Sequence, residues 1–195
     1  MKRVLLLGDS IRMGYQDNVK QLLQGDFDVI APEGNGCDCS STLWQVNQIF
    51  KHADAPFDVI HWNNGYWDMN IEAPMQEALH PLDEYVKYLL RLVPLLKAHT
   101  THLIFANSLP VEREGESVDN SGTGAMIHYQ NNWVKAYNKA AEAVMLLDNV
   151  PINDLYSLCL QEPGYYKSPD HLHLNDKGNQ VLAEEIATVI RNLYA

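Results

Sequence analysis

Three residues near opposite ends of the chain have the side-chain types that acyl transfer requires. Ser10 follows directly on an apolar run, within Gly8-Asp9-Ser10, so its hydroxyl is expected just past the end of a buried strand. Serine becomes a nucleophile only with a base within hydrogen-bond reach, and histidine usually serves because its pKa lies near neutrality. Asp170 and His173 have the Asp-x-x-His spacing, in which the carboxylate accepts from Nδ1–H and Nε2 faces Ser10. We therefore predict that Ser10 is the nucleophile, His173 the base and Asp170 the group that orients it.

The same C-terminal turn allows two other interpretations. His171 is a second histidine, but it is adjacent to Asp170, and adjacent side chains project in different directions, so His173 is preferred as the base. Asp170, His171 and His173 are also types that bind metals. A catalytic zinc usually takes three protein ligands, and no spaced Cys, His or Glu partner accompanies this cluster, so we predict no metal and no cofactor. Taken alone, Gly-Asp-Ser is a common turn and Asp-x-x-His could simply cap a helix; the pairing of the two carries the prediction.

Acyl transfer also needs N–H donors aimed at the developing oxyanion. A predicted strand ends in Asn63-Asn64-Gly65-Tyr66-Trp67-Asp68, which places side-chain amides at a strand end. The loop 33–38 contains Gly34 and Gly36, and glycines let the backbone approach a ligand closely. Each segment alone would pass as an ordinary turn rich in Gly and Asn. Ligands of open α/β sheets bind outside the carboxyl ends of the strands, so we expect these loops to share one rim with Ser10.

Aromatic residues flank these loops and are candidates for substrate contact, because ligand pockets are rich in aromatic side chains. Trp67, Tyr165 and Tyr166 are predicted to bind substrate, with core packing as an equal alternative. Trp62 and Tyr66 belong to the same set, and Trp62 fits a core position at least as well.

The elements that must position these residues alternate between strands and helices, which indicates βαβ units and a parallel sheet. The predicted strands are 3–7, 27–31, 57–62, 102–106 and a weaker one near 149–152. The predicted helices are 15–24, 42–51 with Ser40 or Ser41 as N-cap, 82–98, 125–147 and 175–193, the last with Asn175 as cap.

No composition shift marks a domain boundary, so residues 1–195 are predicted to form a single domain. The polar segment Glu112 to Gly124 is expected to be a long loop at a strand end, either a lid or binding loop or a plain surface excursion.

Composition limits the partners. The chain has 14 Lys and Arg against 25 Asp and Glu, for a net charge of -11, which argues against nucleic acid or an anionic membrane and leaves a neutral sugar or small ester. Cys37, Cys39 and Cys159 are an odd number without zinc spacing, and we expect all three to be structural. No signal peptide or membrane-spanning run precedes or follows the first strand, so the chain is expected to be cytoplasmic. The oligomeric state is left open.

The motifs together resemble the SGNH, or GDSL-type, serine hydrolase family. Gly8-Asp9-Ser10 matches its first block, Asp170-x-x-His173 its last block, and Asn107-Ser108-Leu109-Pro110 resembles the end of its fourth strand. The resemblance implies a three-layer α/β/α sandwich with a flavodoxin-like, five-stranded parallel sheet. It also implies an oxyanion hole formed by the Ser10 backbone N–H, a glycine and an asparagine.

The second and third blocks depart from the family pattern. Gly36 is our choice for the glycine donor, with Gly34 as the alternative. The third block usually reads Gly-x-Asn-Asp, but here Trp67 stands where asparagine is expected, so the role shifts to Asn64, with Asn63 as the alternative. The Asn-Asn-Gly-Tyr-Trp-Asp stretch resembles a subgroup associated with carbohydrate ester chemistry.

We therefore predict a serine esterase that forms an acyl-enzyme and acts on a carboxylic ester, with the O-acetyl groups of a carbohydrate as candidate substrates. An O-acyltransferase could use the same site. A non-catalytic phosphate- or nucleotide-binding module of flavodoxin type is the other alternative, although no Gly-x-x-x-x-Gly-Lys or Gly-x-Gly-x-x-Gly loop follows the first strand. An α/β-hydrolase is disfavoured because the chain has no Gly-x-Ser-x-Gly elbow.

Overall fold

A parallel sheet forms the centre of the protein, in a computed structural model that describes residues 1–115, 117–119, 126–167 and 171–195. The five strands lie in the order β2-β1-β3-β5-β8, and every neighbouring pair is parallel. This confirms the predicted sheet. Their bounds are β1 (Lys2–Leu7), β2 (Phe27–Ile30), β3 (Phe57–Trp62), β5 (Thr100–Ala106) and β8 (Ile152–Asn153).

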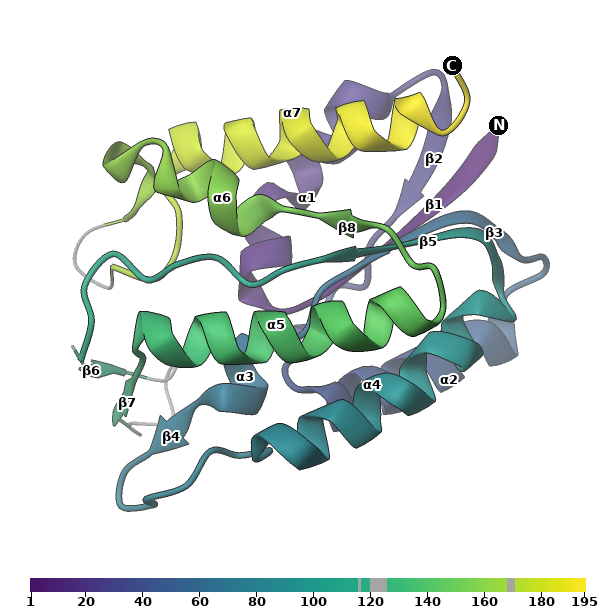
Figure 1. Ribbon diagram of the computed structural model, residues 1–195. Helices are drawn as coiled ribbons and strands as arrows, with labels where there is room; N and C mark the ends of the chain where they lie inside the picture. Colours follow the sequence, from purple (N-terminus) through teal and green to yellow (C-terminus); the bar gives the residue numbers. More distant parts are fainter. Residues whose placement is uncertain (116, 120–125, 168–170) are drawn as a thin grey trace.

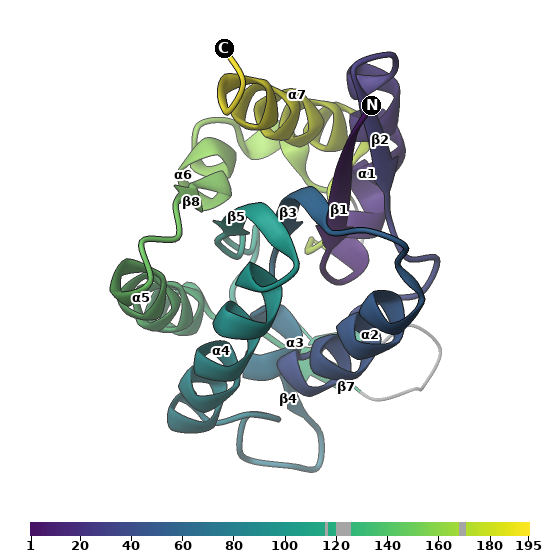
Figure 2. The ribbon, with the colours of Figure 1, turned by 90° about the vertical axis from the view of Figure 1, so that its right-hand side faces the viewer.

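Helices cover both faces of this sheet, as the two orthogonal views show (Figure 1, Figure 2). One face carries α1 (Ser10–Leu23) and α7 (Asp176–Asn192); the other carries α2 (Cys39–His52), α4 (Leu82–Lys97) and α5 (Asn131–Leu147). Strands covered on both faces need apolar side chains at successive positions. The run from Val4 to Leu7 satisfies this, since all four side chains are fully buried.

Two helices begin earlier than predicted because aspartates cap them. We predicted the first helix from Tyr15, but α1 starts at Ser10, and the Asp9 carboxylate accepts a hydrogen bond from the Ile11 N–H. The second helix starts at Cys39 with Asp38 as N-cap, so the prediction of Ser40 or Ser41 as cap was wrong. The carboxylate of Asp38 accepts from both serine N–H groups and both serine hydroxyls, which leaves the serines inside the first turn.

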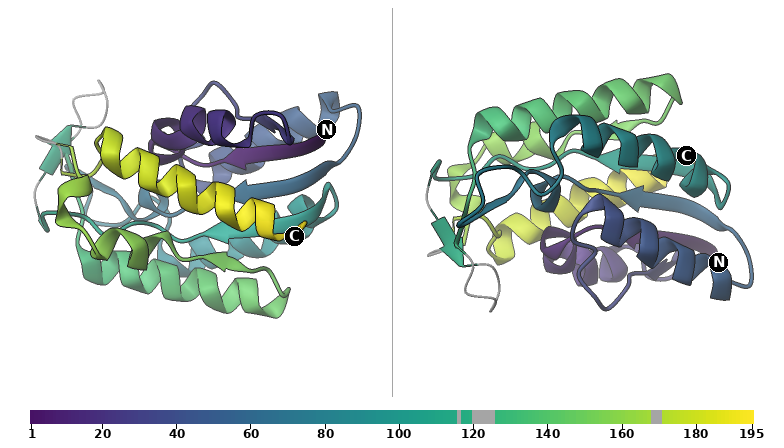
Figure 3. Two further views of the ribbon diagram at one scale, coloured as in Figure 1. Left: turned by 90° about the horizontal axis from the view of Figure 1, so that it is seen from above. Right: turned by 90° about the horizontal axis from the view of Figure 1, so that it is seen from below.

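A second, antiparallel sheet lies near the carboxyl ends of the main strands (Figure 1, Figure 3). It consists of β4 (Ile71–Glu72), β7 (Met126–His128) and β6 (Ser117–Asp119). The predicted loop from Glu112 to Gly124 thus contains a strand, and part of it lies outside the described residues. The predicted helix from Ala125 also begins later, at Asn131, because β7 precedes it. Strands of two or three residues carry too little alternation to be recognised from sequence.

The remaining elements are short: α3 (Tyr66–Met69), α6 (Leu155–Leu160) and one 3-10 turn, Pro163–Tyr165. Among the described residues, no helix is both long enough and apolar enough to cross a lipid bilayer.

Candidate active site

The two ends of the chain meet at Ser10 and His173. The Nε2 atom of His173 lies 2.7 Å from the Oγ atom of Ser10, which is hydrogen-bond distance. Ser10 is the first residue of α1, directly after the carboxyl end of β1. At this position its own N–H is one of the amide groups that a helix leaves without an intrahelical acceptor. The site therefore combines a hydroxyl, a base in contact with it, and a backbone donor on the same residue.

Backbone hydrogen bonds fix the turn that carries His173. The Lys167 N–H donates to the His173 carbonyl over 2.7 Å, and Asn175 N–H donates to the Tyr165 carbonyl over 2.8 Å. Asn175 also caps α7 by accepting from the Gly178 N–H, which confirms the predicted cap. Backbone hydrogen bonds therefore hold the chain in place both before and after His173. Asp170 lies outside the described residues, and its orienting role stays a prediction.

The other histidine of the turn, His171, contacts a different residue. The His171 Nδ1 atom contacts the Glu112 carboxylate, and the Glu112 N–H donates to the His171 carbonyl over 3.2 Å. This pair attaches the turn to the segment that follows β5. His171 and His173 therefore face Glu112 and Ser10 respectively, which agrees with the choice of His173 as the base.

Asp9 is a buried carboxylate next to Ser10. Only 1% of it is exposed, and burial raises its pKa from 3.8 to about 6, although the hydrogen bond from the Ile11 N–H and the nearby His173 act in the opposite direction. Its Oδ1 atom caps α1, whereas its Oδ2 atom has no hydrogen-bond partner within the described part of the chain.

A buried arginine, which we did not predict, ties the nucleophile turn to the loop after β2. The Arg12 guanidinium donates to the Pro32 carbonyl over 2.8 Å, to the Gly34 carbonyl over 2.6 Å and to the Gly8 carbonyl over 3.4 Å. It is 1% exposed. Planar guanidinium groups can satisfy several acceptors at once, so one side chain fixes both loops. Nothing in the local pattern distinguishes Arg12 from a solvent-exposed arginine.

The glycine chosen as oxyanion donor is engaged elsewhere. The Gly36 N–H donates to the Gly8 carbonyl over 3.0 Å, and a Cβ atom on Gly36 would lie only 2.6 Å from that carbonyl oxygen. The structure therefore differs from our prediction: Gly36 allows two backbones to touch rather than presenting a free N–H. For Gly34, the alternative, an added Cβ atom would meet no other atom within 4 Å, and the Gly34 carbonyl accepts a hydrogen bond from Arg12.

The two adjacent asparagines have different surroundings. Asn64 is fully buried; its Nδ2 donates to the Cys37 carbonyl over 3.1 Å and to Thr42 Oγ1 over 3.0 Å, and its Oδ1 accepts from Trp62 Nε1 over 2.6 Å. Both amide hydrogens are thus used to join the loops after β2 and β3, which contradicts the choice of Asn64 as oxyanion donor.

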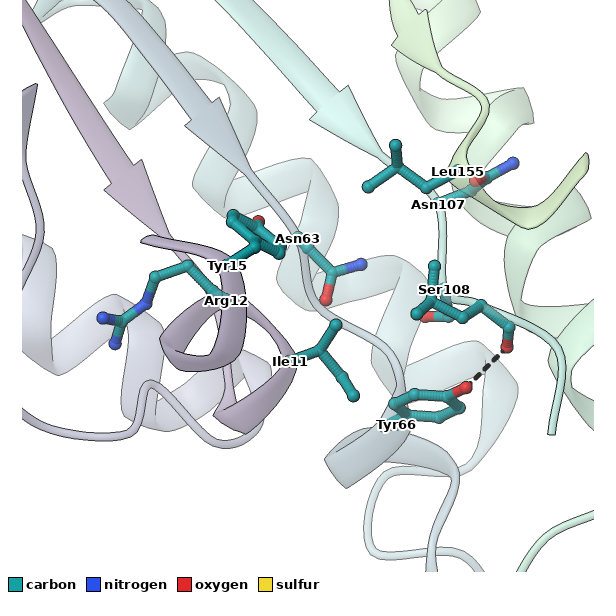
Figure 4. Close-up of a pocket in the computed structure, with 9 residues that line it drawn as sticks. Ile11, Arg12, Tyr15, Asn63, Tyr66, Asn107, Ser108 and Leu155 are labelled. Atoms are coloured by element: carbon teal, nitrogen blue, oxygen red, sulfur yellow. Dashed lines mark hydrogen bonds between the residues drawn. The ribbon is translucent and has the colours of Figure 1, made fainter. Parts of the chain in front are cut away.

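Asn63 is only partly buried, and its Nδ2 donates one hydrogen to the Ala106 carbonyl over 2.8 Å. It also lines a small cavity together with Ile11, the residue after Ser10 (Figure 4). The geometry therefore favours the alternative, Asn63. The other residues around this cavity are Arg12, Tyr15, Tyr66, Asn107, Ser108, Leu109 and Leu155.

Asp68 and His80 form a buried carboxylate–imidazole pair. The His80 Nδ1 atom is 2.8 Å from Asp68 Oδ1, which also accepts from the Cys39 N–H over 3.0 Å. The hydrogen bond with Asp68 raises the pKa of His80, and burial raises the pKa of Asp68. This pair, missed in the sequence, connects α3 and the start of α2 with the segment that enters α4.

The aromatic residues have mixed surroundings. Trp62 is fully buried in the core, as the core interpretation expected. The Tyr166 hydroxyl donates to the Pro110 carbonyl, Tyr165 lies beneath the Lys177 ammonium at 5.5 Å, and Trp67 is half-buried on α3. Substrate contact by Trp67, Tyr165 and Tyr166 stays a prediction.

Cys37, Cys39 and Cys159 are free thiols, not part of a disulfide, and the pKa of each is raised. Cys39 and Cys159 are buried, and burial raises the pKa of Cys159 to about 12. Burial also raises the pKa of Cys37, and the neighbouring Asp38 carboxylate adds to this effect. None of the three therefore has the lowered pKa of a reactive cysteine.

Comparisons with known proteins agree with this fold. The family model described as GDSL-like lipase/acylhydrolase matches residues 58–186, well over half of the chain. No curated protein sequence matches significantly. Among solved structures, the chain is similar to the lipase/acylhydrolase from Enterococcus faecalis, with 18% identity, 99% and 97% of the two chains covered and a TM-score of 0.74.

Two further similar structures are acetyl xylan esterases. The enzyme AlAXEase has 17% identity and a TM-score of 0.72 over 96% of this chain and 99% of that one. Axe2 from Geobacillus stearothermophilus has 18% identity and a TM-score of 0.72 over 97% and 94%. At such identities the likeness shows the fold.

The protein has an α/β fold with a parallel sheet, and a serine and a histidine are in contact at the carboxyl edge of that sheet. Because the family model covers most of the sequence, the chain belongs to the GDSL-like lipase/acylhydrolase family and is an esterase.

Proposed function

We propose that this esterase forms a covalent acyl-enzyme on Ser10. The observation that carries the proposal is the 2.7 Å separation between His173 Nε2 and Ser10 Oγ. In the proposed reaction, Ser10 Oγ attacks the ester carbonyl while its proton moves to His173 Nε2. The tetrahedral intermediate expels the alcohol, which takes the proton from His173. Water then attacks the acyl-enzyme, its proton passing to His173, and the acid and free Ser10 are released. Asp170 orients the imidazole.

The oxyanion is proposed to bind two donors on neighbouring elements. One is the Ser10 N–H at the start of α1, where the helix dipole also favours negative charge. The other is the second amide hydrogen of Asn63, whose first hydrogen is held by the Ala106 carbonyl. Gly36 and Asn64 support this arrangement by joining the loops around it rather than by donating.

A short acyl group on a carbohydrate is the substrate we propose. Two similar solved structures are acetyl xylan esterases, and the net charge of -11 disfavours anionic substrates.

The test is the hydrolysis of p-nitrophenyl esters by the wild-type protein and the Ser10→Ala variant. We expect the wild type to prefer acetate over octanoate and Ser10→Ala to lose about 10⁴-fold or more in kcat while remaining folded. Undiminished acetate turnover by folded Ser10→Ala would refute the acyl-enzyme, and a preference for octanoate would refute the short acyl group.

A further inference from the structure

An exposed tryptophan forms part of a hollow on the outer side of α2. The side chain of Trp44 is 70% exposed, although large apolar side chains are normally buried. The hollow is open, and Trp44 shares its lining with Asn35, Ser40, Ser41, Gln45, Gln48 and Ile49.

The chemistry of this lining is that of a surface for neutral sugars. Its residues supply hydroxyl groups, carboxamides, one indole ring and one isoleucine side chain, and all of them are uncharged, in a chain of which 20% is charged. A pyranose ring has an apolar C–H face that can stack on an indole and a rim of hydroxyls that exchange hydrogen bonds with amides. Aromatic rings with a polar edge serve such mixed surfaces well. An anionic or cationic ligand would find no countercharge among these side chains.

The hollow adjoins the loop after β2, and this loop is bonded to the Ser10 turn. Asn35 lies in the loop after β2, next to Gly36, whose N–H is bonded to the Gly8 carbonyl two residues before Ser10. Gln45 Oε1 lies 3.5 Å from the position that a Cβ atom of Gly36 would occupy. Arg12 ties the same loop to the Ser10 turn. The same loop therefore contacts both the Ser10 turn and the lining of the hollow.

We infer that the hollow around Trp44 is a subsite for a neutral oligosaccharide, which holds sugar units next to the one whose ester lies at Ser10. The inference rests on the proposed function, since it assumes a carbohydrate ester as substrate. A second copy of this chain is a weaker occupant, because each copy carries a net charge of -11 and two copies would repel each other.

The experiment compares a substrate too small to reach Trp44 with substrates that can. Partially acetylated hexasaccharides of xylose, mannose and N-acetylglucosamine are the large substrates, and p-nitrophenyl acetate is the small one. For Trp44→Ala we expect KM to rise about tenfold on at least one hexasaccharide, and kcat/KM on p-nitrophenyl acetate to stay within about twofold. Trp44→Phe, which keeps an aromatic face, should recover part of the loss.

Leu147→Ala is the matched control, because Leu147 is 74% exposed on α5 and lies away from the hollow. It should leave both substrates unaffected. Direct binding is measured by calorimetric titration of unacetylated xylohexaose, mannohexaose and chitohexaose into Ser10→Ala and into Ser10→Ala with Trp44→Ala. Binding should be detected only when Trp44 is present.

The outcomes separate the two proposals. If the wild type hydrolyses neither kind of substrate, the proposed function fails and the subsite fails with it. If it hydrolyses p-nitrophenyl acetate but no hexasaccharide, or if Trp44→Ala changes KM for none of them, the subsite is overturned and the esterase stands. A wild-type dimer that Trp44→Ala converts to a monomer, with saccharide kinetics unchanged, would assign the hollow to self-association and also overturn it.

Discussion

Replacing Asp9 by Asn should stabilise the protein at neutral pH, because it removes a charge that the fold buries. The rise in the pKa of Asp9 from 3.8 to about 6 corresponds to about 3 kcal/mol, at about 1.4 kcal/mol per tenfold change in proton affinity. Asparagine keeps the oxygen that accepts from the Ile11 N–H, and asparagine caps helices as well as aspartate does.

The sign follows from proton linkage. In the unfolded chain Asp9 ionises near pH 3.8, whereas in the fold it ionises near 6. Between these values the folded state holds a proton that the unfolded state has released, so its contribution to stability is present below pH 3.8 and is lost as pH rises to about 6. We therefore expect the advantage of Asp9→Asn to be small at pH 4 and to approach about 3 kcal/mol at pH 8.

The assay is urea unfolding at pH 4 and pH 8, followed by tryptophan fluorescence. Asp17→Asn is the control, because it removes the same charge from a side chain that is 80% exposed and paired with Lys20 at 3.0 Å. Its effect should depend little on pH. If Asp9→Asn and the wild type differ in their free energy of unfolding by the same amount at both pH values, burial of the charged Asp9 does not destabilise the fold, and the reasoning is refuted.

Two further predictions concern the loops around Ser10. Gly36→Ala should lower kcat/KM at least about tenfold, because its Cβ would lie 2.6 Å from the Gly8 carbonyl oxygen and force the loops apart. Gly34→Ala should be nearly neutral, because a Cβ there would meet no atom within 4 Å. Equal activities of the two variants on p-nitrophenyl acetate would contradict this. Asn63→Ala should lower kcat about 10²–10³-fold with little change in Tm, if its free amide hydrogen binds the oxyanion. Asn64→Ala should instead lower the free energy of unfolding by about 2–4 kcal/mol, because it removes three hydrogen bonds made by a fully buried residue; a reversed pattern in kinetics and thermal melts would return the donor role to Asn64.

The main sheet could be predicted because its strands are continuous apolar runs. The bounds of β3 were predicted as observed, and β1 differs by one residue, since Val4 to Leu7 are buried on both faces of the sheet. The helix starts were predicted less well: Asp9 and Asp38 take the capping positions, and several polar residues near each start were chemically able to do so.

The candidate site could be predicted as a set of residues but not as a set of hydrogen bonds. Ser10 and His173 were identified from their types and neighbours, and the structure brings them together. The oxyanion donors were not identified correctly, because the direction of each amide group depends on loops that are distant in sequence. Asn64 faces Cys37 and Thr42, and Gly36 faces Gly8, contacts that exist only once the loops after β1, β2 and β3 are assembled. For the same reason, the roles of Arg12 and of the Asp68–His80 pair could not be predicted from the sequence.

The contact between α1 and α7 makes the Ser10–His173 pair depend on how these two helices pack together. Ser10 begins the first helix and His173 precedes the last, and the two helices approach so closely at Gly14 that a Cβ there would lie 2.7 Å from Asn179 Oδ1. Any change that loosens the packing of α1 against α7 should therefore separate the Ser10 hydroxyl from the His173 imidazole. Under the proposed mechanism, loss of esterase activity would report this loosening even where the sheet itself stays folded.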